Sequence, residues 1–89
     1  MSVAERIKEK LTKTLNPTQI EVIDESHLHA GHASAPEGGE SHFRALIVSE
    51  KFEGVSQVAR QRLVYAALTE EMAGPIHALS LKTLSPKEV

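Results

Sequence analysis

The architecture is decided by residues 56–75, SQVARQRLVYAALTEEMAGP, which have the pattern of one long helix followed by a stop. Two apolar rows recur at helical spacing here, Val64, Leu68 and Met72 in one and Val55, Ala59, Leu63 and Ala66 in the other. They predict a helix over residues 56–73 that is buried against both a sheet and another helix. Gly74 and Pro75 are typical of a helix C-terminus.

Apolar runs with the length of strands lie on both sides of this helix. Residues 43–48, FRALIV, carry apolar side chains on both faces, which is typical of a central strand. Residues 76–84, IHALSLKTL, form the second run, with His77, Leu79 and Leu81 on one face. Because a helical crossover joins the two runs, we expect them to pair in parallel within one sheet.

The residues before position 43 add a helix, a strand and a long loop. Ser2 lies three residues before Glu5, a capping-box pattern, and the apolar residues that follow at four-residue spacing predict a helix over residues 3–15. Residues 20–23, IEVI, predict a strand that forms an antiparallel hairpin with residues 43–48. Between these strands, residues 24–41 form a long His-rich loop, which we expect to be the most mobile internal segment because it offers little to bury.

The predicted order is therefore αββαβ, an α+β fold with two helices on one face of a three-stranded mixed sheet. A chain of 89 residues supports one hydrophobic core, so residues 1–89 are expected to form a single domain. The positions expected in that core are Ile7, Leu11, Ile20, Val22, Phe43, Ile47, Leu63, Leu68 and Leu79. Residues 85–88, SPKE, resemble a helix start, but the chain ends before a further helix is expected to form.

Composition excludes several classes of function. With no cysteine, the chain has no disulfide, no zinc finger and no cysteine nucleophile, so any metal ligand must be His, Asp or Glu. No phosphate-binding loop or HExxH motif is present, and we do not expect an enzyme. The charged N-terminus and the lack of a long apolar stretch predict a cytoplasmic protein that does not enter a membrane. We expect the free protein to be a monomer.

Several motifs, in a fixed order and spacing, resemble the BolA family. They are ESHF at residues 40–43, RQRLVYAALTEEM at residues 60–72 and HALSLKT at residues 77–83. The resemblance covers about residues 4–88 and implies a topology like the type II KH fold. It also implies partnership with a monothiol glutaredoxin, coordination of a 2Fe-2S cluster shared with that glutaredoxin and glutathione, and an association with transcriptional control and the stress response.

The resemblance directs attention to the histidines, which would otherwise be read as solvated or half-buried side chains. The His77-Ala78-Leu79 motif implies that His77 is a cluster ligand, and we expect strand pairing to hold its backbone. The family carries a second ligand in the loop. Counting from Asp24-Glu25-Ser26 indicates His29, whereas counting back from His42 indicates His32, and both remain open. His42 itself is predicted to be structural.

Nucleic-acid binding, with DNA as the partner, is the alternative. Arg60 and Arg62 lie in a stretch without acidic residues, and Lys51 precedes it. Two residues apart on a helix corresponds to about 200° of rotation, so the two arginines cannot line one stripe. The turn at residues 52–55, FEGV, lacks the GXXG sequence of a KH grip. Glu70 and Glu71 are interpreted as surface or capping charges that do not converge.

Overall fold

The computed structural model describes residues 2–25 and 42–89. Its elements are α1 (Val3–Leu15), β1 (Gln19–Asp24), β2 (His42–Val48), the 3-10 turn η2 (Glu50–Phe52), α2 (Gln57–Ala67), α3 (Thr69–Ala73), β3 (Ala78–Leu84) and the 3-10 turn η3 (Pro86–Glu88). The predicted order of helices and strands is confirmed. Residues 26–41, most of the loop predicted to be mobile, lie outside the described residues, so that prediction is not tested.

The first helix has the ends that its sequence predicts. The Ser2 hydroxyl accepts a hydrogen bond from the Glu5 backbone N–H at 3.1 Å, which satisfies one of the free donors of the first turn. Asn16 caps the other end in the left-handed conformation with φ of 44°, one that asparagine adopts more readily than most residues. The helix therefore begins and ends at residues whose side chains suit those positions.

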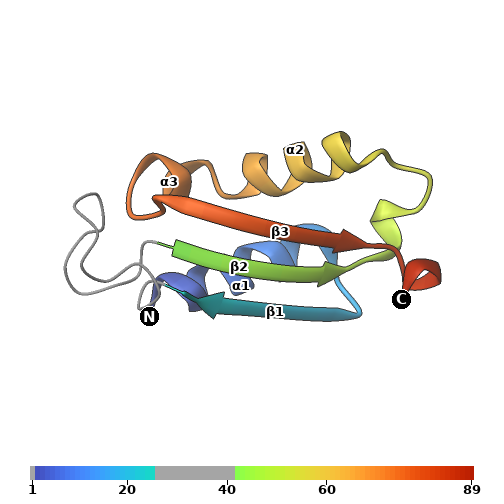
Figure 1. The fold of residues 1–89 in the computed structure, drawn as a ribbon, viewed down its shortest axis with the longest axis horizontal. Coiled ribbons are helices and arrows are strands. Elements are labelled where there is room, and N and C mark those ends of the chain that lie inside the picture. Colours follow the sequence, from blue (N-terminus) through green and yellow to red (C-terminus); the bar gives the residue numbers. More distant parts are fainter. Residues whose placement is uncertain (1, 26–41) are drawn as a thin grey trace.

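The three strands form one mixed sheet in the order β1-β2-β3 (Figure 1). The strand pair β1–β2 is antiparallel, with Val22 opposite Ala45, and β2–β3 is parallel, with His42 opposite Ala78. The central position of β2 and both pairings agree with the sequence-based prediction. Since β2 and β3 are parallel, their first residues lie at the same end of the sheet, next to the last residues of β1.

Both long helices pack on one face of this sheet. The core joins α1, the inner face of β2, η2, α2 and the turn before β3, through Val3, Ile7, Leu11, Leu15, Phe43, Ala45, Ile47, Phe52, Val64, Leu68 and Ile76. On the opposite face, Arg44, Ser80 and Lys82 are exposed. The α+β architecture with two helices on one face is thus as predicted; the likeness to a type II KH topology stays a prediction.

Most of the predicted core positions are confirmed, but Leu63 is not. Ile20, Val22 and Leu79 are partly buried and pack against the core, whereas the Leu63 side chain is 42% exposed. Consecutive helical residues point about 100° apart, so α2 can direct Val64 into the core only by turning Leu63 away from it. The expectation that both apolar rows of this helix are buried was therefore wrong.

The single helix predicted over residues 56–73 is interrupted at Leu68. The backbone N–H of Leu68 is shared between the carbonyls of Val64 and Tyr65, both at 3.1 Å, and the Thr69 hydroxyl donates to the Ala66 carbonyl at 2.9 Å. A threonine hydroxyl bonded to a nearby carbonyl competes with the regular helical pattern. The chain also forms a turn, η3, where no further helix was expected, because Ser85 and Glu88 complete a capping box.

Candidate functional site

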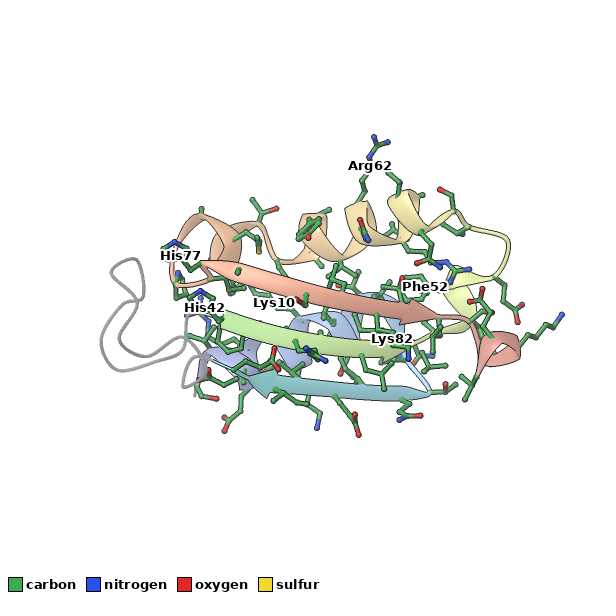
Figure 2. All side chains as sticks on the ribbon, in the orientation of Figure 1. Lys10, His42, Phe52, Arg62, His77 and Lys82 are labelled. Carbon is green, nitrogen blue, oxygen red and sulfur yellow. The ribbon has the colours of Figure 1, made fainter. Side chains whose placement is uncertain are left out.

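Two histidines meet at the end of the sheet where β2 and β3 begin. The imidazole rings of His42 and His77 are stacked, with centroids 5.5 Å apart and ring planes inclined by 12° (Figure 2). His42 is the first residue of β2, but His77 lies one residue before β3 and is not part of the strand. The strand predicted over residues 76–84 therefore starts two residues later, at Ala78, and leaves His77 just outside the strand pairing.

The backbone around His77 is held although its side chain is exposed. On one side, Ile76 is 5% exposed, and its N–H donates to the Glu71 carbonyl at 3.0 Å. On the other side, Ala78 begins the pairing of β3 with β2. His77 itself is exposed to solvent. A fixed backbone and a stacked ring together present an accessible imidazole in a restricted orientation.

The two histidines of the stacked pair differ in exposure. His77 is exposed to solvent, whereas His42 is half-buried at the start of β2. His77 is therefore the more accessible nitrogen donor of the pair. Within residues 2–25 and 42–89, no group of three or more His, Cys, Asp or Glu side chains is placed to hold a metal ion. The predicted loop ligands, His29 and His32, lie outside those ranges.

A buried carboxylate lies close to this end of the molecule and was misread from the sequence. The Glu71 side chain is fully buried and its carboxylate lies 2.8 Å from Arg6 Nη2 and 2.9 Å from Lys10 Nζ. Glu70 is a surface charge as predicted, but it also lies 3.6 Å from Lys10, so the two acids do converge on one lysine. The interpretation of Glu71 as a surface charge was wrong because its cationic partners come from α1, far away in the sequence.

The hydrogen bonds of this cluster change the pKa values of Glu71 and Lys10. Burial by itself would raise the pKa of Glu71, but hydrogen bonds from Lys10, from its own backbone N–H and from Arg6 outweigh burial and lower that pKa. The hydrogen bond to Glu71 raises the pKa of Lys10. The Glu71 carboxylate and the Lys10 ammonium are therefore both charged near neutral pH, and the ion pairs of Glu71 fasten α3 to α1.

Arg60, one of the residues considered for nucleic-acid binding, is buried. It is 4% exposed, and its guanidinium donates to the carbonyls of Val55 at 2.8 Å and Thr83 at 3.0 Å. It also pairs with Glu88 at 2.6 Å and lies over the Phe52 ring, 5.6 Å from its centroid. Arg60 therefore joins α2 to β3 and to the C-terminal turn. No sequence pattern around Arg60 predicts its burial. The capping-box residues Ser85 and Glu88 do predict a turn, and Glu88 of that turn is the ion-pair partner of Arg60.

The other two basic residues considered for nucleic-acid binding are exposed and lie apart from Arg60. Arg62 extends from α2 away from the body of the molecule, as Figure 2 shows. Lys51 is an exposed residue of η2, and its Nζ donates to the Thr14 carbonyl at 2.8 Å. The divergence of Arg60 and Arg62 expected from helical geometry is confirmed. No helix in the described part of the chain is long and apolar enough to cross a membrane.

Comparisons with known proteins agree on one family. The family model described as BolA-like protein matches residues 11–88. The chain is 42% identical over 88 residues to the DNA-binding transcriptional regulator BolA of Escherichia coli (strain K12), which covers 99% of this chain and 80% of that protein. It is 49% identical over 88 residues to SufE-like protein 1, chloroplastic/mitochondrial, of Arabidopsis thaliana, covering 94% of this chain and 24% of that protein.

The structural comparison gives the same result. The BolA domain of SufE1 from Arabidopsis thaliana superposes with a TM-score of 0.89 at 46% identity, covering 100% of this chain and 98% of that one. The chain spans only part of some curated relatives, such as 58% of BolA-like protein 1 of Bos taurus. Sequence motifs, family model and fold all point the same way, and the chain belongs to the BolA-like protein family.

Proposed function

We propose that this chain is the partner of a monothiol glutaredoxin and supplies histidine ligands to a 2Fe-2S cluster that the two proteins share with glutathione. His77 is the proposed ligand from the described part of the chain, and His32 or His29 is the second. The complex would serve iron-sulfur trafficking or iron and redox signalling. The observation that carries the proposal is the exposed imidazole of His77, held by a fixed turn and stacked on His42.

The donor set of the chain fits a shared cluster better than one of its own. A 2Fe-2S cluster needs four protein or small-molecule ligands, usually thiolates, and this chain has five histidines and no cysteine. A partner must therefore supply the thiolates. Imidazole in place of thiolate lowers the net negative charge on such a cluster and raises its reduction potential.

The chain's own contribution is to hold and present the donor nitrogen. Ring stacking on His42 restricts the rotation of His77, and this lowers the conformational entropy that would be lost on binding. The second ligand, His29 or His32, would come from the same chain.

The test is to reconstitute the cluster on a mixture of this chain and a monothiol glutaredoxin with glutathione, and to record visible absorption and circular dichroism. We expect His77→Ala to change the spectrum strongly. His29→Ala or His32→Ala alone should change it less because each can partly replace the other, and the double variant should resemble His77→Ala. Arg62→Ala, exposed and far from His77, is the matched control and should leave the spectrum unchanged. An unaltered spectrum for His77→Ala would refute the ligand assignment.

A DNA-binding role is the second candidate, because the 42% identical relative from Escherichia coli is described as a DNA-binding transcriptional regulator. Of the three basic residues considered for this role, Arg62 and Lys51 are exposed, whereas Arg60 is occupied by carbonyls and Glu88. Duplex DNA at near-physiological salt distinguishes the two roles. If DNA is a partner, Arg62→Ala should weaken binding about equally on all sequences and His77→Ala should not.

A further inference from the structure

The only fully buried acid among the described residues, Glu71, lies between α1 and the turn that carries His77. Its carboxylate is removed from solvent and pairs with two cations of α1, Arg6 and Lys10, which lie 65 and 61 residues away in the sequence. A carboxylate leaves water only where charged partners and hydrogen bonds replace its hydration. The Glu71 side chain therefore fastens α3 to α1.

The helix that contains Glu71 depends on such contacts. Helix α3 spans only Thr69–Ala73, and the residue before it, Leu68, provides no side-chain cap. A helix of this length is not stable on its own. Its position is set by the burial of Leu68 on one side and by the Glu71 carboxylate on the other.

The backbone of the same residue holds the turn that follows. The Glu71 carbonyl accepts hydrogen bonds from the N–H groups of Gly74 at 3.2 Å and Ile76 at 3.0 Å. Ile76 is buried in the core and directly precedes His77. Glu71 thus contacts α1 through its side chain and the residue before His77 through its carbonyl.

We infer that Glu71 is a positioning residue for His77, since it connects the turn before His77 to the first helix. The inference rests on the proposed function, in which His77 is a ligand. Stacking on His42 orients the imidazole only as long as the His77 backbone stays in place. When the Glu71 side chain is released from α1, α3 and its turn gain freedom, and the His77 ring moves relative to His42 although the sheet remains folded.

The experiment compares Glu71→Gln with Glu70→Gln. The first substitution keeps the shape of the side chain and removes its charge, and the second makes the same change on the exposed neighbour. In the free protein, we expect amide exchange at Ile76 to become about tenfold faster relative to global unfolding in Glu71→Gln, since one charge-assisted hydrogen bond changes an equilibrium by roughly that factor. The ring contact between His42 and His77, seen by NMR, should weaken. Glu70→Gln should match the wild-type protein in both measurements.

In the mixed complex with a glutaredoxin, Glu71→Gln should shift the visible circular dichroism towards that of His77→Ala at equal protein loading. Arg6→Gln, which leaves Lys10 on the carboxylate, should produce the same changes to a smaller extent and serves if Glu71→Gln does not fold. A protein that loses stability uniformly, with no added exchange at Ile76 and no change in the ring contact, would overturn the inference.

The outcomes separate this inference from the proposed function. If His77→Ala changes the cluster spectrum and Glu71→Gln does not, Glu71 is not a positioning residue and the ligand role of His77 stands. If His77→Ala has no effect on the spectrum, the proposed function fails. In that case the exchange rate of Ile76 and the ring contact in the free protein decide alone whether Glu71 positions His77.

Discussion

Replacement of Arg60 by methionine tests whether this arginine is structural. Methionine occupies a similar length without donors, so the buried Thr83 carbonyl and the part-buried Val55 carbonyl lose their hydrogen bonds. We assign about 2 kcal/mol to the buried carbonyl and about 1 kcal/mol to the other, within the range for unsatisfied groups. The total of about 3 kcal/mol leaves out the Glu88 pair and corresponds to a fall in Tm of about 12–24 °C for a domain of this size.

The assay is urea and thermal unfolding followed by far-UV circular dichroism, with Arg62→Met as the matched control. Arg62 lies two residues away on the same helix but is exposed, so its substitution should change stability by no more than about 0.5 kcal/mol. Equal midpoints for the two variants would refute the structural reading of Arg60. If the chain binds DNA, Arg60→Met should weaken binding only to the extent that the protein unfolds.

Two further predictions concern the core and the C-terminal turn. Leu68→Ala should destabilise the protein by about 2–5 kcal/mol because the side chain is fully buried, whereas Leu63→Ala, at 42% exposure, should cost less than about 1 kcal/mol in the same unfolding assay. The hydrogen bonds from Arg60 and from the Ser85 backbone lower the pKa of Glu88 from 4.5 to about 2. A carboxylate whose pKa is lowered by folding stabilises the folded protein at pH values above its unfolded-state pKa. The free energy of unfolding of the wild-type protein should therefore exceed that of Glu88→Gln by its full amount above pH 4.5, and this difference should be lost as pH falls through about 2. An advantage that does not change with pH in this window would contradict the assigned ion pair.

If the proposed function holds, the two histidine ligands come from different parts of the fold. The fixed half of the site, His77 on its turn with His42 behind it, belongs to the sheet end and is organised in the free chain. The other histidine would come from the long insertion between β1 and β2. A cluster whose thiolate ligands come from a partner is held by this chain only while that partner is bound, so the binding is reversible. Reversible binding suits transfer or sensing better than permanent storage.

The sequence alone predicts the elements whose signals are local. Ser2 and Asn16 mark both ends of α1, and the apolar patterns of residues 43–48 and 76–84 mark the two strands whose connection makes them parallel. These features depend on hydrogen bonds and side-chain periodicity within one segment, so they can be read without knowing the rest of the fold. The resemblance of residues 77–83 to a family motif also led us to expect His77 as a cluster ligand.

Only the tertiary structure decides which charged and apolar residues of residues 56–73 face inwards. Leu63 is exposed and Glu71 is buried, although the pattern suggests the reverse for both. The stack of His77 on His42 likewise joins the first residue of β2 to the residue just before β3. Arg60 and Glu71 can be buried because their partners, Glu88 and the cations of α1, are brought to them by the fold. The cost of removing a charge from water is offset by groups distant in sequence, so no local pattern predicts which charges the core will accept.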